Sequence, residues 1–396
     1  MRAGVEAASL SLLLCGGMLL SYLTLTTDTE TQREEADLVR VVRSLSAIQQ
    51  KNEAVLSRLE KEALSVVTKK FPWLPKNNTL PNYLLNSGSH TDNDYKYRDA
   101  NIAFIHYPRA GGYRVIECLR EISIKKHIAM SPLMTSKNRL LWERGEDNLE
   151  KFRNRLKFHS GRYVFGVCEK VNSPCSYFLL LREPMQQAIS SYEYCKETYE
   201  DEICHGFNAN KMTLREWILS QGSVLFRQLM LNINFCASDH TFNFNLTLPE
   251  GFLFDKKDMP CWMKQKIFLD KLSSTDLSHA VNYIISHLQG WFAVIGLLDD
   301  PQGSLEVFEK VYKLPFTKCK HFDRKETLSE PHRASFDNSA NSVYQRQSDI
   351  YDENDPYTLS DDVYVRKALS ADYRIYKAAL KIYHMQKQTL SNRIWR

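Results

Sequence analysis

The first pattern along the chain is an uncharged apolar run. Residues 7–25 contain no charged side chain, and nineteen helical residues span about 28 Å, close to the roughly 30 Å hydrocarbon core of a bilayer. Arg2 precedes the run, whereas Asp28, Glu30 and Glu34 are among the acidic residues that follow it. The positive-inside rule therefore predicts a cytoplasmic tail at residues 1–6 and a transmembrane signal anchor at residues 7–27, with the remaining chain outside the cytoplasm or in a lumen. The alternative is a cleaved signal peptide, although no small-x-small cleavage site follows the run.

A seven-residue hydrophobic repeat follows the anchor. Residues 28–70 are polar and lack glycine and proline, and apolar residues recur at the a and d positions typical of a coiled coil. Leu38, Leu45 and Leu59 lie at a, and Asn52 at a is a residue type that fixes register in parallel dimers. We expect a stem that makes the protein a homo-oligomer. The alternative is a single amphipathic helix packed on the rest of the protein.

The remaining chain alternates between apolar runs and amphipathic segments. Pro72 and Pro75 end the helical pattern, and the polar residues that follow predict a linker over 71–97. From residue 98 to 396 we expect one α/β domain with a mainly parallel sheet flanked by helices. The expected strands are 102–107, 163–168, 177–181 and 292–297. The expected helices are 112–124, 146–156, 184–198, 212–220, 223–234, 261–271, 275–288, 303–312 and 362–385.

The composition indicates the kind of ligand, and the cysteine content indicates the cellular compartment. A net charge of +5 over 396 residues is too small to predict nucleic-acid binding, but it suits acidic ligands. Eight of the nine cysteines follow the apolar run, which favours disulfides in an oxidising compartment. Cys168/Cys175 and Cys195/Cys204 are close enough in sequence to pair, although spacing alone does not give the connectivity. No cysteine or histidine cluster has zinc spacing. Sequons at Asn77 and Asn245 predict glycosylation on the lumenal side.

Two strand ends carry the candidate chemistry. Residues 104–113 read FIHYPRAGGY, which predicts a buried strand, a glycine turn and a helix. Such a unit presents free backbone N–H groups and the positive end of a helix to an anion. The second expected strand end delivers Arg182, with Ser190 eight residues later in the next helix; these residues provide a guanidinium fork and a hydroxyl donor. Two anion-binding strand ends predict a ligand with two separate phosphate or sulfate groups.

These segments resemble the Golgi sulfotransferases that use 3′-phosphoadenosine 5′-phosphosulfate (PAPS). In the glycosaminoglycan branch, including the heparan sulfate and uronyl 2-O enzymes, the phosphosulfate loop is similar to F-x-H-x-P-K-T-G-G. The 3′-phosphate segment is similar to L-R-D-P-x-x-R-x-x-S-x-Y, beside LLREPMQQAISSY at residues 180–192 here. A third likeness is FAVIGLLDDP at 292–301, and a fourth is LKFHSGRYVFG at 156–166, where the family carries its active-site histidine. The resemblance covers roughly residues 100–325.

The resemblance implies a P-loop-like sulfotransferase fold in the Golgi lumen, on a single-pass type II membrane protein. It implies that backbone N–H groups of Ala110, Gly111, Gly112 and Tyr113 hold the 5′-phosphosulfate of PAPS and that Arg109 neutralises the leaving oxygen. Arg182 and Ser190 would hold the 3′-phosphate, with no metal required. The acceptor would be a glycan hydroxyl, with glycosaminoglycans as candidates. The alternatives are another acceptor, such as protein tyrosine, and a catalytically impaired relative that acts as a lumenal binding or scaffold partner.

The departures from the family pattern concern the chemical step. Arg109 stands where the branch has lysine, and Ala110 where it has threonine. The family's Gly-His pair aligns with Gly161-Arg162, so the usual basic histidine is absent. His159, three residues upstream, is the first candidate for the general base. His106, Glu117 and Glu169 are further candidates.

Overall fold

The structure, a computed structural model, describes the greater part of the chain after residue 78. The described residues are 79–85, 96–145, 155–171, 173–199, 201–230, 260–319 and 353–394, together with positions 43, 46, 47 and 50. The expected anchor at 7–27 and the sequon asparagines Asn77 and Asn245 lie outside them, as does nearly all of the expected stem. In the described part of the chain, no helix is both long and apolar enough to cross a bilayer.

Four parallel strands form the central sheet. They are β1 (Asn101–Ile105), β2 (Phe158–Gly161), β3 (Cys175–Leu181) and β4 (Phe292–Leu297), in the order β2-β1-β3-β4. Every neighbouring pair is parallel, with Phe104 opposite Phe178 and Ile105 opposite Gly161. Every strand residue is buried, as expected for a sheet covered on both faces. The expectation of an α/β domain with a mainly parallel sheet is confirmed for the described residues, and the carboxyl ends of all four strands meet at one edge.

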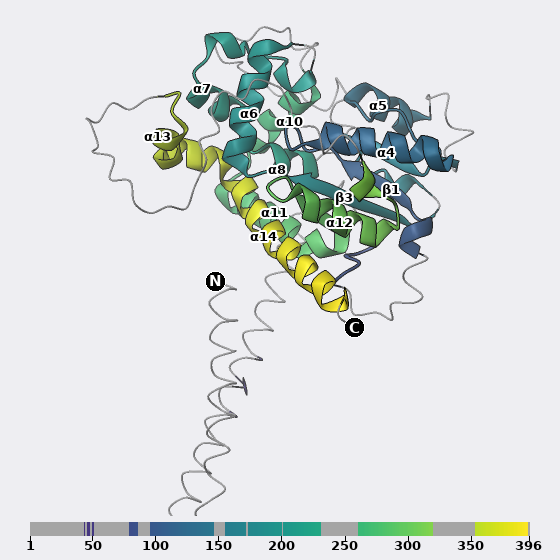
Figure 1. Cartoon of the computed structure of the whole chain (residues 1–396). Coiled ribbons are helices and arrows are strands. Elements are labelled where there is room, and N and C mark those ends of the chain that lie inside the picture. Colours follow the sequence, from purple (N-terminus) through teal and green to yellow (C-terminus); the bar gives the residue numbers. More distant parts are fainter. Residues whose placement is uncertain are drawn as a thin grey trace, which may run out of the picture. The chain divides into compact units, whose positions relative to one another are not determined.

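Helices surround this sheet (Figure 1). They are α4 (Gly112–Lys126), α5 (Ser136–Arg144), α6 (Pro184–Glu197), α7 (Leu214–Gln221), α8 (Val224–Leu229), α10 (Cys261–Asp270), α11 (Ser274–Trp291), α12 (Pro301–Tyr312), α13 (Pro356–Asp361) and α14 (Val363–Ile394). The sequence pattern did not predict α5 and α13. Most of the expected helix 146–156 lies outside the described residues, as does the end of 223–234.

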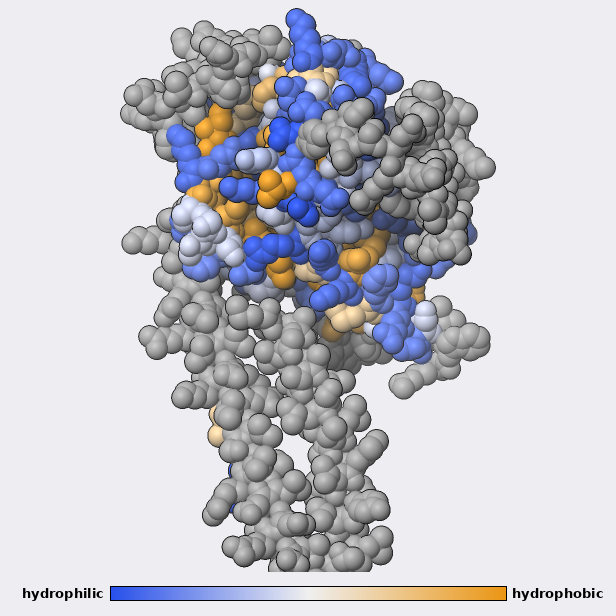
Figure 2. Space-filling model, turned by 90° about the vertical axis from the view of Figure 1, so that its left-hand side faces the viewer, coloured by the Kyte–Doolittle hydropathy of each residue, from blue (hydrophilic) through white to orange (hydrophobic). Residues whose placement is uncertain are grey.

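Aromatic side chains fill both faces of the sheet. Phe178 of β3 packs against Phe308 of α12 and against Tyr312 at its end. The adjacent Tyr177 points to the opposite face, since successive side chains alternate along a strand, and there it contacts Phe165. The helix α14 runs as one long element beside α11 and β4 (Figure 1). On the side shown in Figure 2, hydrophilic residues are interspersed with hydrophobic ones, which is ordinary for a protein surface.

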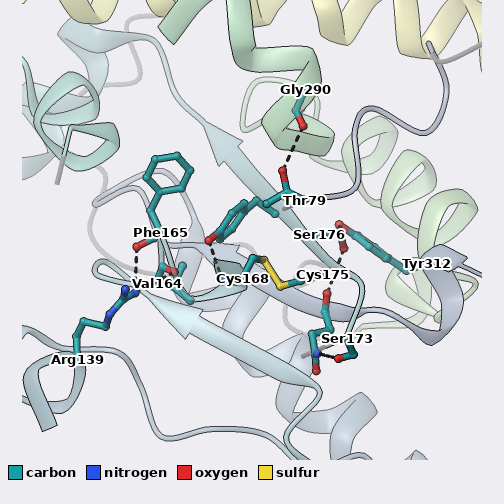
Figure 3. Close-up of a disulfide and its surroundings, with 12 residues drawn as sticks. Thr79, Arg139, Val164, Phe165, Cys168, Ser173, Cys175, Ser176, Gly290 and Tyr312 are labelled. Carbon is teal, nitrogen blue, oxygen red and sulfur yellow. Dashed lines mark hydrogen bonds between the residues drawn. A yellow bond between two sulfur atoms is a disulfide. The ribbon is translucent and has the colours of Figure 1, made fainter. Parts of the chain in front are cut away.

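The expected strand at 163–168 is wrong. The strand is β2 at Phe158–Gly161, and it ends at Gly161, whose φ of 142° takes the chain out of the sheet. The apolar residues that follow are buried but have no neighbouring strand. Their carbonyls bind a side chain instead: Arg139 Nη1 donates to the oxygens of Tyr163 (2.9 Å) and Phe165 (3.0 Å). Figure 3 shows the Arg139 side chain pointing at this backbone.

Three disulfides join pairs of cysteines that both lie among the described residues. The local pairs Cys168–Cys175 and Cys195–Cys204 are confirmed; the first joins the turn before β3 to the start of that strand (Figure 3). The third, Cys118–Cys319, joins α4 to the residues after α12 across 201 positions, and the sequence did not predict it. Cys261 is also disulfide-bonded.

Part of the stretch expected to be a linker packs onto the domain. Tyr83 and Leu84 are buried in the main core. The backbone N–H of Leu80 donates to the carbonyl of Cys175 at 2.8 Å, and that of Tyr83 donates to Ala293 at 3.0 Å. Residues 79–85 therefore belong to the folded domain, beside the amino-terminal ends of β3 and β4.

Candidate functional site

The loop between β1 and α4 lies at the carboxyl edge of the sheet. Arg109 (φ 59°) and Gly111 (φ 71°) both adopt the left-handed conformation, which turns the chain sharply into α4. A Cβ at Gly111 would lie 2.7 Å from Leu298 Cδ1, so a side chain here would have to displace Leu298, and the positive φ itself favours glycine. The helix α4 begins at Gly112 with no side-chain cap and no acidic residue in its first turn. Its positive end is therefore uncompensated, which suits an anion.

The segment after β3 is joined to the backbone of this loop. Arg182 Nη1 donates to the carbonyl of Arg109 at 3.1 Å, and Gln187 Nε2 donates to the carbonyl of Pro108 at 3.2 Å. Glu183 caps α6 by accepting from the N–H of Gln186 at 2.7 Å. Parallel pairing of β1 with β3 places the two segments side by side. The sequence did not predict a role for Gln187, which replaces a basic residue of the family pattern and here fixes the loop.

The Arg109 side chain turns toward α6. Its Nε donates to Ser190 Oγ at 3.3 Å, and its guanidinium lies 4.3 Å from the centre of the Tyr194 ring. Arg109, Arg182 and Ser190, expected to serve two different anionic groups, therefore form one cluster. Nothing in the sequence pattern indicated Tyr194, because its contact with Arg109 depends on the left-handed turn at that residue.

Two arginines lie close together in the cluster, and the carboxylates of Asp299 and Glu183 partly offset their charge. Burial lowers the pKa of Arg182, and the neighbouring charge of Arg109 lowers it further. Both arginines and Ser190 remain partly exposed. Two cations that repel one another beside an uncapped helix end form a site that an anionic ligand would stabilise.

The structure places His159 away from this cluster. It lies in the middle of β2 with no exposed surface, and its ring is 5.5 Å from the ring of Trp142 of α5. Neither ring nitrogen has a hydrogen-bond partner among the described residues. Burial, followed by the charge of Arg139, lowers its pKa to about 4. Of the further base candidates, Glu117 pairs with Arg120 on α4, and Glu169 is exposed next to the Cys168–Cys175 disulfide.

A second group of polar side chains lies on the other side of the loop. Arg162, at the end of β2, forms an ion pair with Asp201. Gln228 Nε2 donates to the carbonyls of His106 (2.9 Å) and Arg162 (3.0 Å), so α8 fixes the ends of β1 and β2 relative to each other. Burial opposes ionisation of Asp201, but Arg162 and the Ile203 N–H outweigh it and lower the pKa of Asp201.

A mainly apolar pocket opens beside this second group. Its lining includes Pro108 of the loop, Arg162, Tyr163 and Trp262. Arg227, which also lines it, is nearly buried, with its guanidinium 5.3 Å from the Trp262 ring. Through Pro108 the pocket adjoins the loop, and through Arg162 it adjoins the end of β2.

Comparison of the sequence with protein-family models finds no matching family. A search of curated proteins likewise finds no match. The case for a function therefore depends on the residues of the site and on the motifs that they form.

Proposed function

We propose that this protein is a PAPS-dependent sulfotransferase that transfers a sulfuryl group to a hydroxyl of a glycan. The observation that carries the proposal is the cluster of Arg109, Arg182 and Ser190 beside the uncapped start of α4. This cluster lies at the carboxyl edge of a parallel sheet, where such folds bind their ligands. The residues present suit a nucleotide with two anionic groups: a helix end with free N–H groups, two guanidinium groups and a hydroxyl.

In the proposed mechanism the chain positions its substrates and supplies charge. The loop N–H groups from Ala110 to Tyr113 bind the 5′-phosphosulfate, and Arg182 with Ser190 binds the 3′-phosphate. Arg109 lies between these groups and balances the charge on the phosphate oxygen that departs. Since the transferred group passes between two oxygens, as in phosphoryl transfer, most of the rate enhancement would come from orientation and electrostatic stabilisation.

The proposed setting is the Golgi lumen. Residues 7–27 would anchor a type II membrane protein and residues 28–70 would form an oligomerising stem, as their sequence patterns predict. The disulfides of the described domain support an oxidising compartment. Glycosaminoglycans are the first acceptors to test.

The test is transfer of radiolabelled sulfate from PAPS by the purified full-length chain. The acceptors are desulfated heparan, chondroitin and dermatan chains, with a tyrosine peptide for the alternative acceptor class. We expect transfer to one glycan, and we expect Arg182→Ala to reduce it at least 100-fold, because a charge-assisted phosphate clamp is lost. Arg120→Ala, an exposed arginine on α4, is the control. Undiminished transfer by Arg182→Ala would overturn the assignment.

One observation favours a second candidate, a non-catalytic relative that binds PAPS or a partner. Arg162 stands where the family has its histidine and is paired with Asp201, and His159 is enclosed in the sheet. In that case the chain would bind 3′-phosphoadenosine 5′-phosphate (PAP) but transfer sulfate to none of the acceptors.

A further inference from the structure

The proposed reaction needs a group that removes the acceptor proton. Such a base must come within about 3 Å of the acceptor oxygen. His159 is completely buried and packed against Trp142, so no acceptor reaches it in this structure. Arg162 is a cation already paired with Asp201, and arginine does not give up its proton in proteins.

His106 occupies a more suitable position. It directly follows β1 and is partly exposed. Its ring stacks on Phe104, with the ring centres 6.4 Å apart. The Cδ2–Nε2 edge of the ring lies against Gly112, the first residue of α4, since a Cβ on Gly112 would collide with His106 Cδ2 and Nε2. The imidazole therefore lies at the uncapped helix end, where the proposed mechanism places the sulfuryl group. No hydrogen bond occupies either ring nitrogen among the described residues.

We propose that His106 is the general base of the transfer, an inference that rests on the proposed function. The acceptor oxygen attacks sulfur and forms the new O–S bond while its proton passes to a ring nitrogen of His106. The bond between sulfur and the bridging phosphate oxygen breaks, and its electron pair stays on the departing PAP. The imidazolium then releases its proton to water.

Charged groups surround His106 and set its basicity. Loss of hydration, followed by the charge of Arg162, lowers the pKa of His106 to about 3, and Arg109 acts in the same direction. The ring is therefore neutral at any pH of the secretory pathway, and it is a weak base until the substrates bind. Asp201 has the opposite effect on the pKa and would stabilise the imidazolium as it forms. A bound phosphosulfate adds negative charge next to the arginines and raises the basicity of the ring.

The backbone around His106 is also fixed. Gln228 holds the carbonyls of His106 and Arg162 from α8, and the Arg162–Asp201 pair is attached to α6 through the Cys195–Cys204 disulfide. A base held in this way loses little entropy when the acceptor binds. The pocket lined by Pro108 and Arg162 is small, about 40 Å³, so it has room for the end of an acceptor that carries the hydroxyl and not for a whole sugar ring.

The test compares His106→Gln with the wild-type full-length chain in two measurements. One is kcat for transfer from PAPS to the acceptor that the wild type uses, and the other is PAP affinity by calorimetry. We expect kcat to fall 100- to 10,000-fold, the usual contribution of a general base, with the Kd for PAP within about threefold of wild type. His106→Ala should recover part of its activity in added imidazole. His127→Gln, at an exposed position after α4, is the control.

The outcomes separate this inference from the function on which it rests. Near-normal kcat in His106→Gln would overturn the inference and leave the proposed function standing. A loss of PAP affinity equal to the loss of kcat would also overturn the inference, because equal losses indicate a structural role for His106. A wild-type chain that binds no PAP would overturn the proposed function and this inference with it.

The variant His159→Phe removes the rival candidate base from its buried position. It should keep kcat within about tenfold of wild type; a loss as large as that of His106→Gln would contradict the assignment of His106 as the base.

Discussion

At the scale of single residues, the candidate site depends on where Arg109 points. Its left-handed backbone sends the side chain toward Ser190 and Tyr194 instead of along the loop. The resemblance assigned Arg109 and Ser190 to different ends of the nucleotide, whereas here they touch. Since an arginine side chain is long and flexible, Arg109 can reach a ligand oxygen from this position. Tyr194 would hold its guanidinium ready in the absence of ligand.

A second residue, Asp372 of α14, makes the stability of the folded domain depend on pH. Its carboxylate accepts from the N–H groups of Leu225 (2.9 Å) and Phe226 (2.8 Å) at the start of α8. Burial nevertheless raises its pKa to about 6. Because its pKa is raised in the folded state, the folded chain binds more protons than the unfolded chain between about pH 4 and pH 6. The contribution of Asp372 to the free energy of unfolding is therefore present below pH 4 and is lost as the pH rises through 6.

We therefore expect the stability of Asp372→Asn, relative to wild type, to improve as pH rises from 4 to 6. The change between pH 4 and pH 6 should be about 2 kcal/mol, out of about 3 kcal/mol for the complete titration, because each pKa unit corresponds to about 1.4 kcal/mol. Urea unfolding at several pH values measures it. Parallel curves for wild type and variant would show that Asp372 titrates normally in the folded chain.

At the scale of elements, the start of α4 connects the loop to the proposed base. Gly112 has no space for a Cβ because the His106 ring lies there. We expect Gly112→Ala to displace His106 and to destabilise the domain by about 1–3 kcal/mol through overpacking. The free energy of unfolding from urea titration gives this value, and transfer activity should fall by more than the lost stability explains.

The matched control for this substitution is Gly290 in α11. A Cβ there meets no atom within 4 Å, so Gly290→Ala should be neutral or stabilise the helix by up to about 1 kcal/mol. Equal effects of the two substitutions would show that the contact between Gly112 and His106 has no energetic importance.

The apolar pattern correctly predicted the strands whose side chains are buried and whose backbone pairs with neighbouring strands. β1, β3 and β4 are continuous hydrophobic runs that lie in a sheet, and Arg182 was placed correctly at the edge because it directly follows such a run. The pattern failed at residues 163–168, where apolar side chains are buried but carbonyls bind Arg139 instead of a neighbouring strand. It also missed α5, whose sequence SKNRLLWER is mostly polar. Side-chain contacts between distant segments, such as Arg109 with Tyr194, have no local sequence signal.

At the scale of the whole molecule, the Cys118–Cys319 disulfide closes the longest loop among the three disulfides whose cysteines the structure describes. It joins positions 201 residues apart, whereas Cys168–Cys175 joins positions 7 apart. If a disulfide acts mainly by restricting the unfolded chain, replacing Cys118 and Cys319 by alanine should lower the free energy of unfolding by about 5 kcal/mol. Replacing Cys168 and Cys175 should lower it by about 2 kcal/mol. Denaturant unfolding of the two double variants tests this order. A larger loss from the Cys168–Cys175 variant would show that local packing outweighs chain entropy.

The same long-range connection bears on function. Cys118 lies on α4, the helix whose amino-terminal end faces the proposed phosphosulfate. The disulfide anchors the middle of this helix to the segment after α12, while Arg182 and Gln187 fix the loop at its start. The proposed anion site is therefore held from two sides of the domain, as preorganised electrostatic stabilisation requires.

The most direct test of the central claim is calorimetric titration of PAP into the purified full-length chain, beside Arg182→Ala and the Arg120→Ala control. We expect micromolar binding by wild type and by Arg120→Ala. We expect at least 100-fold weaker binding by Arg182→Ala, because that variant loses the guanidinium that binds the loop at the carbonyl of Arg109. Absence of PAP binding by a well-folded wild-type chain, or equal binding by Arg182→Ala, would contradict the claim that this sheet edge is a nucleotide site.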